Sequence, residues 1–401
     1  MLHPIDGGVT APLGFRAAGL HCGVKKNGKP DLALLVSDAP ATAAAVFTTN
    51  LAQAAPVTVS KEHLAASGGR ARAVVTNSGC ANACTGPQGL EDAREMTVLT
   101  AQAVGCDPRD VLVASTGVIG VNLPMPALRT GIPTAAAALS PEGGLAAADA
   151  IMTTDPFPKS AAVSLALPGG TVRVGGMTKG SGMIEPRMAT MLGYLTTDAA
   201  VDAVRLRRVL TDACRFTFNA ITVDGEPSTN DCVFALANGA SGVVIDDATE
   251  AALFEAFRSV AQTLALGIVR GGEGATKLVA VTARGAASDA DAWTAARAIA
   301  NSLLVKTAIH GADPNWGRLV AAAGRSGAGF VLDRARVCVG PHVLFEDGRP
   351  FDDRAPAAAQ YLQGSDLEVE VDLGIGGPTT PPSGRVIFRR MPSRSTPEVR
   401  T

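Results

Sequence analysis

The segment Met177–Leu192, which reads MTKGSGMIEPRMATML, holds the residues best suited to chemistry. Glycines permit positive φ and proline fixes φ, so the segment predicts a structured loop before the apolar run Met191–Leu195. Thr190 lies at this junction. A threonine becomes a nucleophile when a base removes its proton, and that base can be its own α-amine, with a reference pKa of about 8. Thr190 gains such an amine only if the Ala189–Thr190 bond is cut; otherwise it is an ordinary β-branched residue at a strand edge.

A second candidate is the pair Thr116 and Gly117, which follows the expected strand Val111–Ser115. A Thr-Gly step at a strand end can aim a hydroxyl and a backbone N–H at one point, as stabilisation of a tetrahedral oxyanion requires. The competing interpretation is an ordinary β-turn.

Two charged residues are candidates for substrate binding. Lys179 lies eleven residues before Thr190, in the glycine-rich segment, and suits the carboxylate of an amino-acid substrate. Glu273 lies between two glycines and suits an amino group. The alternatives are a solvated lysine and a surface-loop carboxylate.

Length and composition exclude several classes of protein. At roughly 150 residues per domain, 401 residues favour two to three domains. The net charge of −2, with no run of like charges, argues against a nucleic-acid partner. No apolar window is long enough for a membrane helix and no secretory signal opens the chain, so we expect a cytoplasmic protein without a membrane partner.

Metal and disulfide chemistry have little support. The seven cysteines form no C-x-x-C pair, and we expect free thiols. The five histidines show no ligand spacing, so no metal site is expected.

Short apolar runs alternate with Ala-rich stretches of helical period, which predicts a mixed α/β fold. Strands are expected at 31–37, 44–48, 72–76, 111–115, 336–345, 367–373 and 385–388, and a hairpin at 161–177. Helices are expected at 89–104, 142–153, 202–216, 248–269 and 291–307. The Pro-, Gly- and Ala-containing segment 124–144 is interpreted as a candidate linker.

Six ordered motifs together resemble the glutamate N-acetyltransferase (ornithine acetyltransferase) family of arginine biosynthesis. They are NACTG at 82–86, STGVIG at 115–120, MTTD at 152–155, KGSGMIEPRMATML at 179–192, GEGATK at 272–277 and GADPNWGR at 311–318. FTTN at 47–50 and APV at 55–57 extend the likeness toward the N-terminus.

The resemblance implies an α/β, autoprocessed N-terminal-nucleophile-type enzyme with mixed sheets packed against helices. Cleavage between Ala189 and Thr190 would give chains 1–189 and 190–401, which stay together as an α2β2 heterotetramer. Thr190 would take the acetyl group of N2-acetylornithine and pass it to glutamate, with Thr116 and Gly117 as the oxyanion hole. No cofactor is implied, although some members also use acetyl-CoA as an acetyl donor.

The resemblance also assigns substrate-binding residues. Thr153 matches a substrate-contacting threonine in the MTTD motif, beside Lys179 and Glu273. Family members end with an Asn five residues before a terminal Thr or Ser, both in contact with substrate; here Thr396 replaces the Asn and Thr401 is terminal. Asp313, Asn315 and Arg318 are interpreted as capping groups outside the site.

Two other functions remain open at this point. An N-terminal-nucleophile aminopeptidase or amidase would share the cleavage but let water attack the acyl-enzyme. A catalytically silent amino-acid-binding homologue would fit the altered C-terminus.

Overall fold

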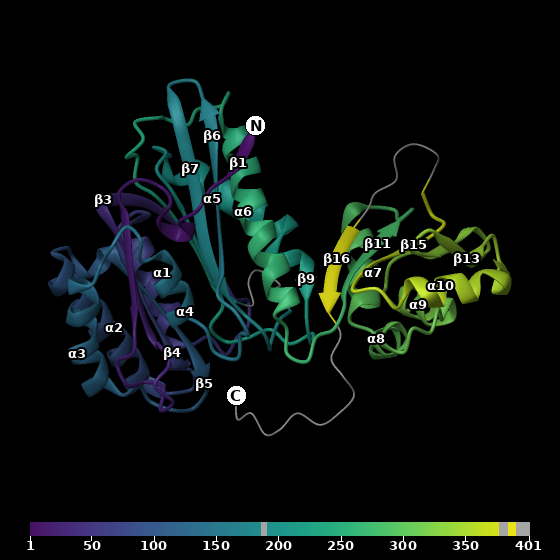
Figure 1. Ribbon diagram of the computed structural model, residues 1–401, viewed down its shortest axis with the longest axis horizontal. Coiled ribbons are helices and arrows are strands. Elements are labelled where there is room, and N and C mark those ends of the chain that lie inside the picture. Colours follow the sequence, from purple (N-terminus) through teal and green to yellow (C-terminus); the bar gives the residue numbers. More distant parts are fainter. Residues whose placement is uncertain (186–190, 377–383, 390–401) are drawn as a thin grey trace. The chain divides into compact units, whose positions relative to one another are not determined.

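The computed structural model describes residues 1–185, 191–376 and 384–389, and the chain forms two compact units (Figure 1). The first unit comprises the described residues of Met1–Asn219 and Pro227–Ile268. The second comprises Ala220–Glu226 and the described part of Val269–Pro397. Each unit has its own mixed sheet and its own helices, so each is described separately.

The first unit is built on one sheet of order β1-β6-β7-β8-β10-β3-β4-β5, with β2 paired to β3. Strand β3 is long and its register shifts between Val36 and Ala41, so its first half pairs with β2 and β4 and its second half with β10. The strands are β1 Leu2–Pro4, β2 Phe15–Leu20, β3 Leu32–Phe47, β4 Arg70–Cys80, β5 Val111–Val118, β6 Lys159–Leu167, β7 Gly170–Lys179, β8 Leu192–Thr197 and β10 Cys232–Ala237.

The two halves of this sheet pack on each other through a shared core. The Tyr194 hydroxyl of β8 and the Thr76 hydroxyl of β4 are 2.7 Å apart and fully buried, although β8 and β4 are not neighbouring strands. One apolar cluster includes Leu35, Leu112 and Phe234, from β3, β5 and β10. The bend in β3 therefore brings the ends of distant strands together.

Helices cover the outer faces of the sheet, with α1, α2 and α3 beside β4 and β5 and α6 beside β6 and β7 (Figure 1). Helix α6 is long and apolar enough to cross a membrane by length and composition, but half of its most apolar window is buried in the protein, as in a core helix. The helices are α1 Ala55–Ala66, α2 Gly86–Val104, α3 Met125–Ala137, α4 Gly144–Ala150, α5 Ala203–Phe216 and α6 Glu250–Arg270.

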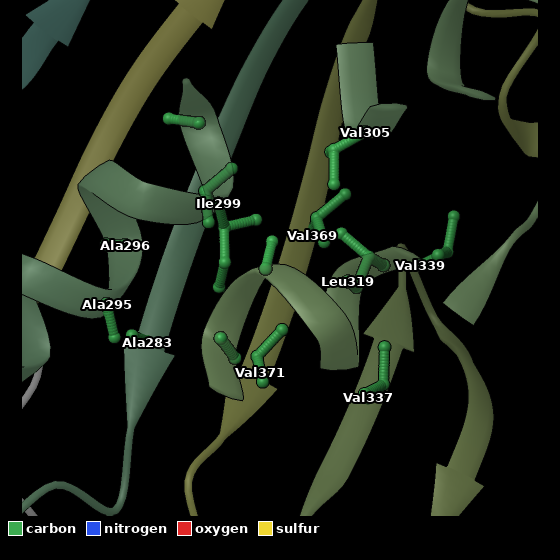
Figure 2. Packing of buried hydrophobic residues seen from close by; sticks show 14 of the residues in the cluster. Ala283, Ala295, Ala296, Ile299, Val305, Leu319, Val337, Val339, Val369 and Val371 are labelled. Atoms are coloured by element: carbon green, nitrogen blue, oxygen red, sulfur yellow. The ribbon is translucent and has the colours of Figure 1, made fainter. Parts of the chain in front are cut away.

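The second unit carries a sheet of order β14-β13-β12-β15-β11-β16-β9. Figure 2 shows its core, in which small and branched side chains of α7, α8 and α9 meet those of β11, β12 and β15. The strands are β9 Ile221–Thr222, β11 Leu278–Arg284, β12 Arg336–Val339, β13 His342–Glu346, β14 Arg349–Pro350, β15 Asp366–Asp372 and β16 Gly384–Arg389. The helices are α7 Asp289–Ala300, α8 Leu303–His310, α9 Trp316–Gly324 and α10 Ala355–Tyr361.

The mixed α/β architecture with sheets packed against helices is confirmed, as is the hairpin, formed by β6 and β7. The linker interpretation of 124–144 was wrong, because this segment forms α3 and the start of α4. The expected helix 291–307 is two helices, since the Ser302 hydroxyl accepts from the Val305 N–H and starts α8. The expected strands 31–37 and 44–48 are the two halves of β3.

Candidate active site

Lys179 and Thr116, predicted separately, meet at the ends of two strands of the first unit. Lys179 ends β7 and Thr116 lies near the end of β5. The Lys179 Nζ donates to Thr116 Oγ1 at 3.1 Å, and each residue is only 9% exposed. Because the Thr116 oxygen accepts this bond, its own proton can be donated to another acceptor. That is the property an oxyanion-hole hydroxyl needs.

Gly117, the second oxyanion candidate, has a backbone that requires glycine. Its φ is 133°, and it lies opposite Gly79 in the parallel pair of β4 and β5. A Cβ at Gly117 would lie 2.3 Å from the Gly79 carbonyl carbon, which is closer than any side chain can tolerate. The absence of a side chain thus permits β5 to pass close to the backbone of β4 at Gly79, directly after Thr116.

Asp155 ties the two predicted substrate-binding segments together. Its Oδ1 accepts from the Gly180 N–H at 2.7 Å, and its Oδ2 accepts from the Thr153 N–H at 3.1 Å. The Lys159 Nζ also donates to Oδ1, at 2.5 Å. The carboxylate therefore fixes the backbone next to Lys179 and the backbone of half-buried Thr153.

The electrostatics of this group follow from burial and opposite charge. Burial acts to raise the pKa of Asp155, but the charges of Lys179 and Lys159 and the hydrogen bonds from Lys159 and Gly180 hold it below its usual value. Burial lowers the pKa of Lys159 and outweighs the opposing effect of Asp155.

Asp155 and Lys159 were not among the residues predicted from the sequence. Asp155 lies in the MTTD motif, in which only Thr153 was predicted to bind substrate. Asp155 and Lys159 are four positions apart. An acidic and a basic residue at this spacing, with two prolines between them, were the only feature of the sequence that indicated an ion pair here.

Asn230 and Asp231, also missed, close the site from the start of β10. The Asn230 Nδ2 donates to the carbonyl of Ala81 at 2.6 Å and to that of Ser115 at 2.9 Å, and so joins the ends of β4 and β5 directly before Thr116. The Asp231 carboxyl accepts from the hydroxyl and the N–H of Ser228. Burial raises the pKa of Asp231 well above its usual value.

Four predicted residues, Ala189, Thr190, Thr396 and Thr401, lie outside the described residues. Met191, which follows Thr190 in the chain, is buried, and its carbonyl accepts from the Cys232 N–H at 3.0 Å. Glu273 belongs to the second unit and lies three residues after Arg270, the last residue of α6.

Asn315, interpreted as a capping residue, does cap a helix. Its side chain accepts from the Arg318 N–H at the start of α9.

Comparison with known proteins identifies relatives over nearly the whole chain. The ArgJ family model matches residues 16–381. The arginine biosynthesis bifunctional protein ArgJ of Symbiobacterium thermophilum is 52% identical over 377 residues, covering 93% of each chain. The protein of the same name from a Synechococcus species is 52% identical over 388 residues, covering 93% of this chain and 92% of the relative.

A solved structure, ornithine acetyltransferase from Mycobacterium tuberculosis complexed with ornithine, is similar to part of the chain. It is 43% identical, with 47% of this chain and all of that chain covered, at a TM-score of 0.44.

Proposed function

The chain belongs to the ArgJ family of arginine-biosynthesis proteins, and on this premise we propose that it transfers an acetyl group from N2-acetylornithine to glutamate. The observation that carries the proposal is the buried contact between Lys179 Nζ and Thr116 Oγ1. It places a cation suited to a carboxylate beside a hydroxyl suited to an oxyanion.

In the first half-reaction the Oγ of Thr190 attacks the acetyl carbonyl carbon, and its proton moves to the α-amine that cleavage after Ala189 provides. The oxyanion is stabilised by the Thr116 hydroxyl and the Gly117 N–H. The bond between the acetyl carbon and the substrate nitrogen then breaks, and the nitrogen takes the proton from the α-amine. Ornithine departs, and the acetyl group remains as an ester on Thr190.

In the second half-reaction the amine of glutamate attacks the same ester. N-acetylglutamate forms and the Thr190 hydroxyl is regenerated. One site thus serves both amino acids, whose shared carboxylate and amine would be held by Lys179, Glu273 and Thr153, with Thr396 and Thr401 at the C-terminus.

The wider setting belongs to the same proposal. The two cleaved chains, 1–189 and 190–401, assemble as an α2β2 heterotetramer in the cytoplasm. The reaction needs no cofactor, and acetyl-CoA is a candidate second acetyl donor.

A product assay tests the proposal against hydrolysis. Enzyme incubated with N2-acetylornithine and glutamate should form N-acetylglutamate. With N2-acetylornithine alone it should release about one equivalent of ornithine per active site and little acetate, because the acetyl group stays on Thr190. Acetate formed at the same rate with and without glutamate would indicate an aminopeptidase or amidase instead. No turnover of either kind would indicate a binding protein.

A further inference from the structure

The buried ion pair of Asp155 and Lys159 is next to Lys179 but has no part in the reaction proposed above. The Lys159 Nζ and the Asp155 Oδ1 are 2.5 Å apart, and the side chains are 2% and 0% exposed. Such a pair is costly to bury, because both ions lose their hydration.

Lys179 and Lys159 are both attracted to the same carboxylate. The charge of Lys179 interacts with that of Asp155, yet the Lys179 Nζ donates to Thr116 Oγ1 while Lys159 makes the direct ion pair. A buried carboxylate that lost its cation would pair with the next cation within reach. Lys179 is the cation whose charge acts most strongly on Asp155. Lys25 also interacts with Asp155, but its Nζ donates to the carbonyls of Pro30 and Met152.

A second carboxyl group near Lys179 does not compete in this way. The charge of Lys179 also interacts with Asp231, but Asp231 is fully buried and takes its hydrogen bonds from Ser228. Burial raises the pKa of Asp231 well above its usual value, whereas the pKa of Asp155 is held below its own. Asp155 is therefore the carboxylate that must be balanced.

We propose that Lys159 is a positioning residue that neutralises Asp155 and so leaves the Lys179 ammonium directed at Thr116 and available to a substrate carboxylate. The inference rests on the proposed function for the identity of the ligands, which are α-amino acids. It concerns binding, so it can be tested without turnover.

The test measures the dissociation constant of ornithine by titration calorimetry, beside that of 1,4-diaminobutane, which is ornithine without its carboxylate. In Lys159→Met, Asp155 should pair with Lys179, so ornithine should bind about tenfold or more weakly, while the diamine should change less than about twofold. Lys26→Met removes an exposed lysine of the same unit and should leave both constants unchanged.

The double variant Asp155→Asn with Lys159→Met shows whether Lys159 acts through the charge of Asp155. It removes the competing charge as well, so it should bind ornithine several-fold more tightly than Lys159→Met, although one of the hydrogen bonds from the Gly180 and Thr153 N–H groups is lost. A merely structural role for the pair would make the double variant bind no better than the single one. That result, or unchanged ornithine binding in Lys159→Met, would overturn the inference.

If Lys159→Met does not fold by circular dichroism, the double variant and Asp155→Asn alone decide. These two variants share the loss of the Asp155 carboxylate and of one of its hydrogen bonds from the Gly180 and Thr153 N–H groups. Equal ornithine affinity in the two supports the inference, because Lys159 then acts only through Asp155, and weaker binding in the double variant than in Asp155→Asn overturns it. A wild-type protein that binds neither ornithine nor glutamate also overturns it. Absent acetyl transfer with the expected binding pattern would contradict only the proposed function.

Discussion

The two units bury different kinds of side chain. At the strand ends of the first unit, Asp155, Lys159, Lys179 and Asp231 are all buried within one group. In the described part of the second unit the one buried charged residue is Lys306, whose Nζ donates to the Val223 carbonyl at 2.9 Å. Burying charge is costly unless partners compensate it, so a concentration of buried charge indicates a site rather than a core.

The second unit shows what a core without such a site looks like. Alanines of α7 such as Ala295 and Ala296 lie in one cluster with Ala283 of β11 and with valines of β12 and β15, and none of these side chains is more than 2% exposed (Figure 2). Packing of this kind stabilises a fold through apolar area alone. We therefore expect substitutions in the buried charged group of the first unit to change catalysis, and substitutions in the apolar core of the second unit to change stability.

The largest effect is expected from Thr190→Ala. The hydroxyl must attack the preceding carbonyl for self-cleavage and the acetyl carbonyl for catalysis, so this variant should remain one chain of 401 residues and lose transfer. Intact-mass measurement should show two fragments for the wild type and for Thr190→Ser. Two fragments from Thr190→Ala would remove Thr190 from the mechanism.

Thr116→Ala should lower kcat by about 10² to 10³, because one oxyanion donor is lost. KM for either substrate should change less, and Thr116→Ser should retain most of the rate. A raised KM with unchanged kcat would instead make Thr116 a residue of ground-state binding.

Ile299→Ala should test the other half of the comparison. Ile299 is fully buried in the second core, and its truncation should lower the free energy of unfolding by about 3 kcal/mol, against about 1 kcal/mol for Ile299→Val. Both tryptophans, Trp293 and Trp316, lie in the second unit, so their fluorescence in urea reports on it. Thr116→Ala should leave this transition unchanged; an equal shift would contradict the division of roles.

The smallest effect is expected from Ser302→Ala, which removes the N-cap of α8. The loss should be about 1 kcal/mol in the same fluorescence transition, and Ser302→Thr should restore most of it. If the free energy of unfolding fell no more than it does when an exposed serine is replaced by alanine, the cap would contribute nothing to stability.

Local features of the fold were predictable from the sequence. Gly169 and Gly170 between alternating runs indicated the hairpin of β6 and β7. Asp202 indicated the start of α5, and its side chain does accept a hydrogen bond from the Arg205 N–H at 2.8 Å. The bend of β3 was not predictable, because the segment at Pro40 could end a strand as well as bend one. Pairing with β10 and β4 decides between these outcomes, and both are distant in sequence.

The residues of the candidate site likewise divide into those that local sequence indicated and those that depend on contacts distant in sequence. Thr116, Gly117 and Lys179 were found from residue type and local setting, and the contact of Lys179 with Thr116 joins residues 63 positions apart. Asp155, Lys159 and Asn230 act through burial and long-range hydrogen bonds, which residue types alone do not indicate. The roles of all the predicted site residues, Thr190 and Glu273 among them, stay predictions from the sequence.

The central claim is that Thr190 carries the acetyl group covalently between the two substrates. Wild-type enzyme mixed with N2-acetylornithine alone, quenched with acid and digested, should give a peptide beginning at Thr190 with the mass of one added acetyl group. Glutamate added before the quench should remove that mass and yield N-acetylglutamate. An unmodified peptide, together with intersecting rather than parallel double-reciprocal plots for the two substrates, would contradict the covalent route.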